Sequence, residues 1–448
     1  MKLFSMPISA QAKSIAIWGA GREGAAALDY VRSHRPDATI TVLNDAPLSP
    51  AAAAALGKTR VLVGAEAASA LSAGMFQVVI KSPGVSPYRP EVEKAKRRGV
   101  EFTSVTNLWF EENPAARTIA VTGTKGKTTT SSLIHHMLRG AGMDASLIGN
   151  GGVPALMQKT AHDVTVLELS SYQTADLKHA PTIAVITSLY PEHAPWHGGV
   201  ERYFNDKLRL AQLDSKTLLV TNRADPRLHE AFASRPNTMW FNDSGGFRVV
   251  DGELYRGEAP LAHPHFPLKG AHNLANLAAA LTVVEHLGLD PAACERSLAD
   301  FAIPPHRLSE FTVDGVLCVD DSISTIPEAT LAALKTFADR PYCLILGGED
   351  RGQTYAELYA YLKIRPPRFL ALLPANGKRI ADELAALAPP FERRLAENLA
   401  EAVDACFLRL QKGDLLLLSP AAPSYGQFAN FEERGRVFEE LCRAKAVK

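Results

Sequence analysis

The chain has 448 residues, of which 46% are hydrophobic and 21% charged, and its 48 basic and 48 acidic side chains give a formal net charge of zero. This length exceeds one ordinary hydrophobic core and predicts two or three domains. The balanced charge excludes a general attraction to nucleic acid or to an anionic membrane surface, and no apolar run approaches the roughly 18 residues that span a bilayer. We therefore expect a soluble enzyme that acts on metabolites.

The beginning of the chain, MKLFSMPISAQAKS, lacks the apolar core and cleavage-site pattern of a secretory signal. The cysteines are odd in number, widely scattered and without CxxC spacing, which predicts reduced core thiols in a cytoplasmic protein. They are Cys294, Cys318, Cys343, Cys406 and Cys442.

Apolar strand-like runs alternate with helical patterns along the whole chain. Continuous apolar runs that end in Gly, Ser or Asp are typical of parallel sheets that are buried on both faces. The sequence therefore predicts an α/β protein. The runs are SIAIWGAG, ITVLND, FQVVIKSPG, TIAVTGTKG, VTVLELSS, IAVITSLY, GVLCVDDS, YCLILGG and DLLLLSP.

The rhythm of strands and helices restarts after ENPAAR, at residues 112–117, and near the Pro-Pro pair of FAIPPHR, at residues 301–307. The segment from Trp240 to Pro267 is rich in Gly and aromatic residues, which predicts a small antiparallel excursion inside the middle domain. We predict three nucleotide-type α/β domains at residues 1–112, 113–303 and 304–448.

GAGREG, at residues 19–24, follows the first strand-like run and opens a helix, and Asp45 ends the next run. This is the outline of a dinucleotide-binding turn, in which glycines allow close backbone approach and the helix amino end attracts phosphate. The same pattern suits a nicotinamide cofactor, the diphosphate of a nucleotide sugar, or a turn that only packs a helix against a strand.

The stretch VTGTKGKTTT, at residues 121–130, is a shortened phosphate-binding loop. The usual signature has a longer spacer between its first glycine and the Gly-Lys pair. Because the loop follows an apolar run and precedes a helical segment, Lys127 is expected to reach nucleotide phosphates and the Thr128 hydroxyl to ligate Mg²⁺. The alternative is a polar turn without a ligand.

Two polar side chains follow further strand-like runs. Glu168 ends a run that is expected to lie beside the loop strand, at the sheet edge where ligands gather. His193 follows a third run. A single loop histidine is usually a solvated or capping residue, but together with Glu168 it forms a candidate second metal site.

Several motifs resemble, in order and spacing, those of the Mur ligases: TGTKGKTTT, ELSSYQT, PEH followed by YFNDKLRL, KGAHNLANLAAA, PPHRLSEF, DDSISTIPEA and SPAAPSYGQFANFEERG. The likeness runs from the first glycine turn almost to the carboxyl terminus, and the short GTxGK(S/T) loop is that family's own form. It implies a three-domain architecture with a Rossmann-like first domain, a central P-loop ATPase-type domain and a Rossmann-like third domain. It also implies an ATP-dependent ligase of peptidoglycan synthesis that works through an acyl phosphate.

The resemblance assigns roles to individual residues. For ATP they are Gly123, Thr124, Lys125, Gly126, Lys127, Thr128, Thr129, Asn273, Asn276, Arg307 and Asp321; for two Mg²⁺ sites they are Thr128, Glu168, His193 and Lys207. Catalysis is assigned to Lys127, His193, Lys207 and Arg307. The nucleotide-sugar residues are Gly19, Gly21, Arg22, Asp45 and Asn150, and the glutamate residues are Thr325, Arg351, Ser424 and Phe431.

Two of these roles change how the residues are interpreted. From its surroundings in the sequence, Lys207 is an ordinary lysine on a helix surface, whereas the resemblance implies a carbamate that supplies oxygen ligands and negative charge to Mg²⁺. Arg307 is expected to stabilise charge on the transferred phosphate, the alternative being a pair at a domain seam.

Within the family, the likeness is closest to enzymes that join glutamate to UDP-N-acetylmuramoyl-L-alanine. Members that add D-glutamate typically read DSKATN and SPACAS, but this chain has Ile323 and Ile326 in the first motif and Pro423 in the second. An isoleucine cannot hold a carboxylate, and the pattern is similar to a smaller branch that adds L-glutamate. Arg351 is placed to clamp the side-chain carboxylate through two hydrogen bonds. L-glutamate is the expected substrate and D-glutamate the alternative.

Three other functions are weighed against this one. A folate-polyglutamylating ligase shares the ATP chemistry but not the front glycine turn. An NAD-dependent oxidoreductase would use that turn, but no hydride-transfer site follows it. A nucleotide-gated binding protein would bind the nucleotide without catalysing a reaction. We further expect a cytoplasmic monomer whose third domain closes over ATP.

Overall fold

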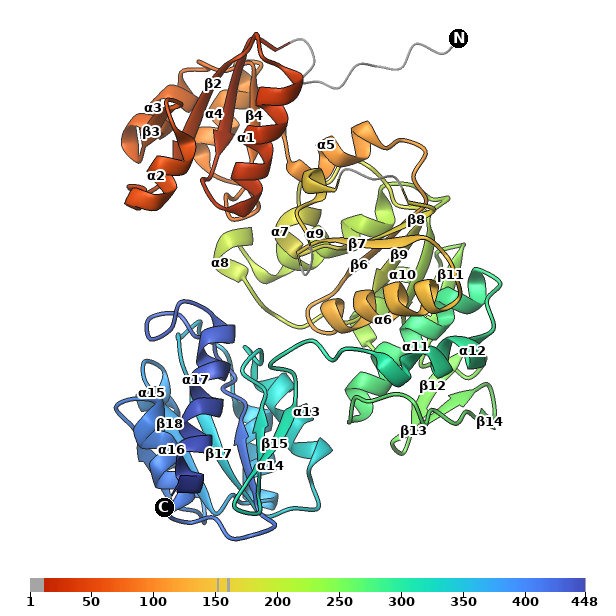
Figure 1. Cartoon of the computed structure of the whole chain (residues 1–448), viewed down its shortest axis with the longest axis vertical. Coiled ribbons are helices and arrows are strands. Elements are labelled where there is room, and N and C mark those ends of the chain that lie inside the picture. The colour runs from red at the N-terminus through yellow and green to blue at the C-terminus, as the bar shows by residue number, and fades with distance from the viewer. Residues whose placement is uncertain (1–11, 151–152, 159–161, 448) are drawn as a thin grey trace. The chain divides into compact units, whose positions relative to one another are not determined.

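The computed structural model describes residues 12–150, 153–158 and 162–447. The segment 1–11, which carries most of the stretch examined for a secretory signal, lies outside these residues. Figure 1 labels helices and strands along the chain. The chain divides into two compact units. The first unit comprises Met1–Val250, Leu254–His265 and Ala275–Ala299, and the second comprises Asp251–Glu253, Phe266–Leu274 and Asp300–Lys448.

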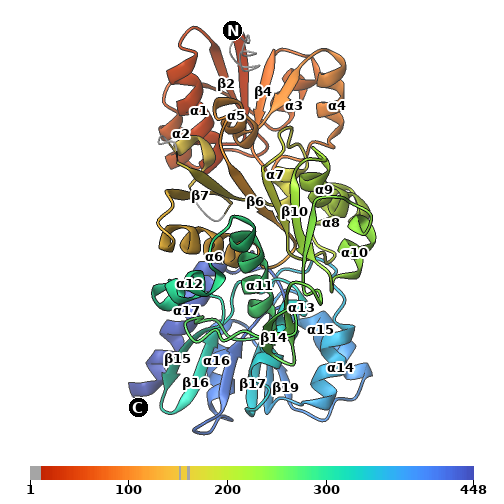
Figure 2. The same ribbon diagram turned by 90° about the vertical axis from the view of Figure 1, so that its right-hand side faces the viewer.

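The amino-terminal part of the first unit is a parallel five-stranded sheet in the order β3-β2-β1-β4-β5. Its inner strands β1 and β4 are almost wholly buried because helices cover both faces: Figure 2 shows α1 and α2 on one side and α3 and α4 on the other. The elements are β1 (Ser14–Trp18), α1 (Arg22–His34), β2 (Thr39–Asn44), α2 (Pro50–Leu56), β3 (Arg60–Val63), α3 (Ala65–Ser72), β4 (Val78–Lys81), α4 (Pro90–Arg97), β5 (Glu101–Thr103) and α5 (Val105–Glu112).

The central sheet of the first unit has six parallel strands in the order β11-β10-β9-β6-β8-β7. β6 lies between β9 and β8, so that Val121 is opposite both Val185 and Glu168. The elements are β6 (Thr118–Thr122), α6 (Lys127–Gly140), β7 (Ala145–Gly149), η2 (Ala155–Met157), β8 (Val164–Glu168), α7 (Ser171–Thr174), β9 (Ile183–Ile186), α8 (Ala194–His197), α9 (Val200–Gln212), β10 (Leu218–Asn222), α10 (Pro226–Phe232) and β11 (Thr238–Phe241).

A small sheet, β12-β13-β14, follows the central sheet in the chain, and β13 pairs with β14 antiparallel. This confirms the antiparallel excursion that was predicted between Trp240 and Pro267. The elements of this stretch are β12 (Phe247–Val250), β13 (Glu253–Arg256), β14 (Ala259–Pro260), α11 (Ala271–His286), α12 (Pro291–Arg296) and η3 (Ser297–Asp300).

The sheet of the second unit has six strands in the order β15-β16-β20-β17-β18-β19. Only β15 is antiparallel to its neighbour, because it forms a hairpin with β16 at Asp314 and Gly315, whose φ values are +48° and +82°. The elements are β15 (Ser309–Val313), β16 (Val316–Asp320), α13 (Pro327–Thr336), β17 (Tyr342–Gly347), α14 (Ala356–Ile364), β18 (Phe369–Leu373), α15 (Gly377–Ala386), β19 (Arg393–Leu395), α16 (Leu399–Phe407), β20 (Leu415–Leu418), α17 (Phe431–Arg443) and η4 (Ala444–Val447).

Each of the nine apolar runs forms a strand, which confirms the predicted α/β class. All five cysteines are buried and free, as predicted for reduced core thiols. Within the described part of the chain, no helix has both the length and the apolar character needed to cross a membrane. The boundaries at residues 112 and 303 fall at the end of α5 and in the loop before β15, and the division into domains at these positions stays a prediction.

The first turn of α1 holds a buried carboxyl group. Glu23 Oε1 accepts a hydrogen bond from Gln173 Nε2 at 2.9 Å, and its Oε2 has no hydrogen-bond partner among the described residues. Burial raises the pKa of Glu23 from 4.5 to about 7, against smaller opposing effects of Gln173 and of Lys81. The folded state therefore holds a proton here more tightly than the unfolded chain does.

Glu23→Gln is expected to stabilise the protein at pH 8 but not at pH 5. A carboxyl group with a raised pKa stabilises the fold below its unfolded pKa, and this stability is lost as the pH rises through about 7. We expect the difference in unfolding free energy between variant and wild type to grow by roughly 2 kcal/mol between these pH values. Thermal unfolding at both pH values measures it.

The matched control is Glu66→Gln, which changes an exposed glutamate in the first turn of α3. That variant is expected to differ from wild type by the same amount at pH 5 and pH 8. An equal effect of Glu23→Gln at both pH values would contradict the prediction.

Candidate functional site

The shortened loop at residues 123–126 connects β6 to α6, and the segment after β9 holds its backbone. The N–H of Thr124 donates to Ser188 O at 2.8 Å, and Thr187 Oγ1 donates to Lys125 O at 2.5 Å. Gly126 precedes α6 with a φ of +86° and gives the helix no side-chain cap. The first N–H groups of α6 are therefore available to an anion.

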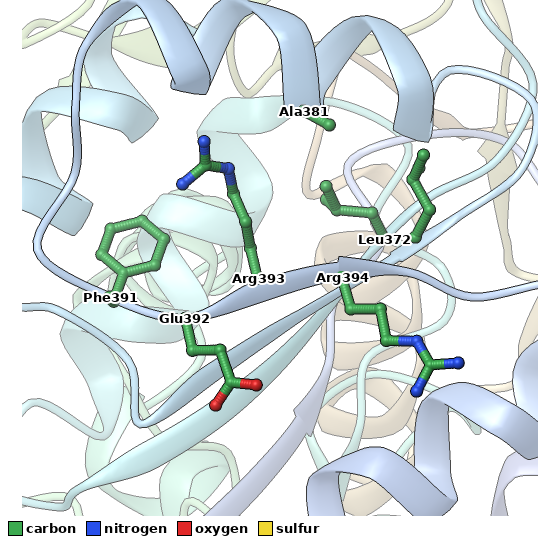
Figure 3. A pocket seen from close by; sticks show the side chains of 7 residues that line it. Leu372, Ala381, Phe391, Glu392, Arg393 and Arg394 are labelled. Carbon is green, nitrogen blue, oxygen red and sulfur yellow. The ribbon is translucent and has the colours of Figure 1, made fainter.

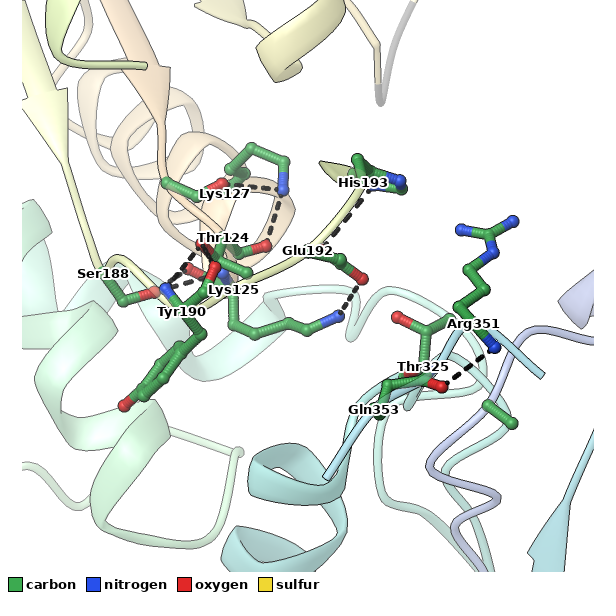
Figure 4. Close-up of polar contacts among 12 residues, drawn as sticks. Thr124, Lys125, Lys127, Ser188, Tyr190, Glu192, His193, Thr325, Arg351 and Gln353 are labelled. Carbon is green, nitrogen blue, oxygen red and sulfur yellow. Dashed lines mark hydrogen bonds and ion pairs between the residues drawn. The ribbon is translucent and has the colours of Figure 1, made fainter. Parts of the chain in front are cut away.

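Lys125 in the loop and Lys127 at the beginning of α6 have different partners (Figure 4). Lys127 Nζ donates to Gly123 O at 3.0 Å and to Thr124 O at 2.9 Å, so its ammonium group lies back over the loop. Lys125 Nζ is 3.2 Å from Glu192 Oε1. Thr129, in the first turn of α6, is buried.

Glu168 lies at the end of β8, next to the loop strand as predicted. Its side chain is only 1% exposed, and Oε1 accepts hydrogen bonds from Thr128 Oγ1 at 3.1 Å and from Asn150 Nδ2 at 3.0 Å. Glu168 Oε2 is buried and has no hydrogen-bond partner among the described residues. A carboxylate oxygen that is buried without a partner is costly, which indicates that a cation or a donor belongs beside it.

His193 lies between β9 and α8 in the left-handed conformation, with a φ of +53°. Its Nδ1 is 3.0 Å from the hydroxyl oxygen of Tyr172, and its Nε2 is 3.7 Å from Glu192 Oε2. A positive φ at a non-glycine residue is uncommon and needs support from its surroundings. Tyr172 provides a hydrogen bond to the ring here.

Lys207 is buried, which shows that its interpretation as an ordinary surface lysine was wrong. The residue is 2% exposed on α9, its Nζ donates to Gly123 O at 2.7 Å, and its ammonium lies 5.1 Å from the centre of the Tyr203 ring. Burial, followed by repulsion from Lys127, holds the pKa of Lys207 well below 10.5. Both effects favour the neutral, nucleophilic form of the amine.

The two asparagines that were predicted to bind ATP, Asn273 and Asn276, are both buried on α11. Asn276 Oδ1 accepts a hydrogen bond from Thr130 Oγ1 at 3.3 Å, so it adjoins the helix that follows the loop. Asn273 Nδ2 donates to Lys269 O at 2.8 Å and belongs to the second unit.

Asp321 follows β16 and is buried. Its Oδ2 accepts hydrogen bonds from the hydroxyl groups of Ser324 and Ser419, the second at 2.7 Å. Burial outweighs these bonds and raises the pKa of Asp321 to about 7. Arg307 precedes β15 and is only partly buried, and its Nη1 donates weakly to Pro305 O at 3.4 Å.

The four predicted glutamate residues lie in loops of the second unit or at the beginning of α17. Ser424 is 5% exposed, and Phe431 is the first residue of α17, whose carbonyl accepts a hydrogen bond from Ser322 Oγ at 2.8 Å. Arg351 contacts Glu349, and Thr325 O contacts Gln353. Ile326 is 1% exposed and Ile323 is partly buried, so neither isoleucine that replaces a polar residue of the DSKATN motif is fully exposed to solvent.

The front glycine turn holds the predicted nucleotide-sugar residues. The backbone at Gly19 has a φ of +104°, and Gly21 and Arg22 are exposed at the beginning of α1. Asp45 Oδ2 is 2.7 Å from Arg89 Nη1, and its Oδ1 accepts a hydrogen bond from Trp18 Nε1 at 3.3 Å. Asn150 contacts Glu168, at the central sheet.

Several residues with contacts to predicted site residues were not predicted from the sequence, among them Tyr203 and Arg89. The Tyr203 hydroxyl is 2.8 Å from Thr124 Oγ1, and its ring lies under Lys207. The sequence could have indicated Tyr203, because it precedes Lys207 by four residues, which is about one helical turn. Arg89, the partner of Asp45, also stacks on Trp18 with 4.7 Å between the guanidinium and the ring centre, and no sequence signal pointed to it.

In the part of the chain that the structure covers, no group of three or more His, Cys, Asp and Glu side chains is placed to hold a metal ion. A cavity of about 420 Å³ lies between α15 and β19 (Figure 3). None of the predicted site residues lines it. Its lining comprises Leu372, Ala381, Phe391, Glu392, Arg393, Arg394 and Leu395.

Comparison with known proteins identifies the family. Residues 121–284 match the Mur ligase middle domain. The chain is 40% identical to a UDP-N-acetylmuramoyl-L-alanine--L-glutamate ligase of Xanthomonas euvesicatoria, over 96% of this chain and 95% of the relative. The chain belongs to the Mur ligase family. A relative with the same name in a Micromonospora species is 39% identical to this Mur ligase over 97% of each chain.

Solved structures confirm the architecture. The UDP-N-acetylmuramate-alanine ligase of Thermotoga maritima superimposes with a TM-score of 0.62 at 20% identity, covering 98% of this chain and all of that one (100%). The MurF ligase of Thermotoga maritima, solved in complex with ADP, has a TM-score of 0.60 at 16% identity and covers 98% of this chain and 96% of its own. This Mur ligase therefore has the predicted three-domain α/β architecture.

Gly126→Ala is expected to destabilise this Mur ligase more than Gly142→Ala does. The two glycines have nearly equal φ values, +86° and +82°. A Cβ at Gly126 would lie 2.3 Å from Asn276 Oδ1, whereas a Cβ at Gly142 would meet nothing within 4 Å. Left-handed backbone costs alanine about 1–2 kcal/mol at either position, and overpacking adds roughly 1–3 kcal/mol at Gly126 alone.

Thermal or urea unfolding of both variants measures this difference. Equal destabilisation would show that Asn276 yields to the added methyl group at no cost.

Proposed function

We propose that this Mur ligase joins L-glutamate to UDP-N-acetylmuramoyl-L-alanine, with ATP as the energy source, in peptidoglycan synthesis. The names of relatives that are 40% identical over nearly the whole chain support this function. The departures from the D-glutamate motif at Ile323, Ile326 and Pro423 support the L form. The same reaction with D-glutamate is the second candidate.

The observation that carries the catalytic part is the buried carboxylate of Glu168. Its unpartnered Oε2 lies on the same side chain that accepts a bond from Thr128, at the amino end of α6. An anion-binding helix end beside a buried carboxylate is the arrangement that a nucleotide phosphate with a divalent cation requires. The pairing of β6 with β8 brings the two together.

The reaction has two steps. In the first, the terminal carboxylate of the nucleotide-sugar substrate attacks the γ-phosphorus of ATP, which forms an acyl phosphate and releases ADP. In the second, the neutral amino group of glutamate attacks the acyl carbon, phosphate leaves, and the amide loses the former amine proton. Chemistry of this kind depends on positioning and on charge stabilisation.

The loop residues and the first turn of α6 bind the ATP phosphates in this proposal. Lys127 turns its ammonium from the loop carbonyls toward the phosphates, and Arg307 stabilises the charge on the transferred group. Asn273 and Asn276 contact the adenine, and Asp321 contacts the nucleotide from the third domain. The remaining phosphate-binding residues are Gly123, Thr124, Lys125, Gly126, Thr128 and Thr129.

Thr128 and Glu168 fit magnesium, because hydroxyl and carboxylate oxygens are its preferred ligands. These two residues would hold one ion, and His193 would hold a second together with the carbamate oxygens proposed below for Lys207. Bound Mg²⁺ would neutralise phosphate charge. Glu168 is already preoriented by hydrogen bonds to Oε1, which leaves Oε2 for the ion.

We also propose that Lys207 carries a carbamate. The neutral amine attacks carbon dioxide, and the loss of one proton leaves a carbamate anion in place of the amine. Burial and the nearby Lys127 both favour the neutral amine that this reaction needs. The product would relieve the repulsion among the lysines of this region.

The three predicted domains divide the substrates among them. Residues 1–112 bind the uridine diphosphate group, residues 113–303 bind ATP, and residues 304–448 bind glutamate. The uridine diphosphate and sugar contacts are Gly19, Gly21, Arg22, Asp45 and Asn150, and the glutamate contacts are Thr325, Arg351, Ser424 and Phe431. We also propose a monomer in the cytoplasm, and the free, buried cysteines support a reducing compartment.

Purified protein is expected to release ADP and form product with L-glutamate, and at least about tenfold more slowly with D-glutamate, when UDP-N-acetylmuramoyl-L-alanine and ATP are present. A factor of ten corresponds to about 1.4 kcal/mol in the transition state. Mass spectrometry of the product and coupled detection of ADP measure both rates. The Glu168→Gln variant serves as the inactive control. Faster turnover with D-glutamate would establish the second candidate, and no ADP with either form would refute the proposed function.

In ¹³C-bicarbonate solution, the wild type is expected to show a carbamate carbonyl resonance that Lys207→Arg lacks, because arginine stays protonated. The matched control is Lys81→Arg, since Lys81 is also buried, at 1% exposed, but its Nζ is 3.0 Å from Asp176 Oδ2. The control variant is expected to keep the resonance. A resonance that persists in Lys207→Arg would assign the carbamate elsewhere.

A further inference from the structure

The loop that follows β17, at residues 348–353, is held by an ion pair with α15. Both Nε and Nη2 of Arg379 donate to the carboxylate of Asp350 at 2.8 Å, and the N–H of Gly352 donates to Asp350 Oδ1 at 2.9 Å. The bonds from Arg379 lower the pKa of Asp350, which keeps the carboxylate ionised. The loop therefore has a defined shape at its tip.

Arg351 lies one residue beyond this ion pair. Its Nε and Nη2 are both 2.8 Å from Glu349 Oε2. The side chain of Arg351 is 31% exposed and that of Glu349 is 40% exposed, so the guanidinium remains within reach of a ligand. The neighbouring carboxylate orients it.

Gln353 connects this loop to the loop that carries Thr325. Its Oε1 accepts a hydrogen bond from the N–H of Arg351 at 3.1 Å, and its Nε2 donates to Thr325 O at 3.2 Å. Figure 4 shows the three residues side by side, with the bond between Gln353 and Arg351 drawn. One planar amide therefore sets the distance between the backbones of Arg351 and Thr325.

The residues on either side of Thr325 are anchored in the second unit. Ser324 is 3% exposed and donates its hydroxyl hydrogen to Asp321, and Ile326 is 1% exposed. Thr325 itself is only partly buried. The bond from Gln353 thus joins the partly exposed Thr325 to the loop of Arg351.

We propose that Gln353 is a specificity-determining positioning residue for the amino-acid substrate. The inference rests on the proposed function, in which Thr325 and Arg351 both contact glutamate. An amino acid with a second carboxylate is recognised by the separation of its charged groups and by the direction in which they leave the α-carbon. Gln353 fixes the separation of Arg351 and Thr325, which contact these charged groups. It thereby selects the chain length of the amino acid and its L or D configuration.

Two substitutions test this role. Gln353→Met keeps the length of the side chain but removes both hydrogen bonds, and Gln353→Glu keeps the acceptor for Arg351 but removes the donor to Thr325. Each variant is expected to raise the KM for L-glutamate about tenfold, as lost positioning bonds do. The KM values for ATP and for the nucleotide sugar are expected to stay within about twofold. The preference for L-glutamate over D-glutamate and over L-aspartate is expected to fall.

The matched control is Gln411→Met, because Gln411 is exposed in the turn before β20, at the other end of that strand from the loop that carries Ser424. It is expected to leave all three KM values and both preferences unchanged. Thermal unfolding shows whether each variant is folded at the assay temperature. Unchanged glutamate KM and preferences in both Gln353 variants, or a parallel rise of all three KM values, would overturn the inference.

Failure of the proposed function gives a different result. If the wild type couples another amino acid, the KM shift is expected for that amino acid instead, which refutes glutamate as the substrate but supports the role of Gln353.

Discussion

The parallel pairing of β6 with β8 and β9 determines where the polar groups of the first unit meet. The register places Val121 opposite Glu168, so the end of β8 lies beside the loop that leaves β6. The segment after β9 then bonds to the loop backbone through Thr187 and Ser188. Because parallel strands all end at one edge, a shift of this register would separate Thr128 from Glu168. The positions of the amino end of α6, of Glu168 and of Lys207 all depend on this register.

Much of the fold follows from local patterns in the sequence. The buried strands read as continuous apolar runs because helices cover both faces of each parallel sheet, and all nine such runs are strands. The positions of the loop and of Glu168 follow from the rule that ligands gather at the carboxyl ends of these strands. The β15–β16 hairpin was not predicted, although Asp314 and Gly315 form a recognised turn signal between two apolar stretches.

The burial of individual polar side chains could not be predicted in the same way. Lys207 lies in a charged helical segment that resembles a solvated face, and only the tertiary packing against Gly123 and Tyr203 removes it from water. Gln353 is equally inconspicuous, because its role depends on a contact with Thr325, 28 residues earlier in the chain. Periodicity reports which face of an element is apolar, but it carries no information about which distant backbone group a polar side chain meets.

The two ends of the Gln173 amide have separate tasks, since Oε1 caps α7 by accepting from the N–H of Ser170 and Nε2 donates to Glu23 in α1. The orientation of this amide is therefore fixed, and neither end has a second choice. Glutamate at position 173 would retain the acceptor for Ser170. It would replace the donor to Glu23 with a second carboxyl group in a buried place, which is unfavourable. Leucine at this position would lose both hydrogen bonds. Glutamine at position 173 therefore serves α7 and α1 at the same time.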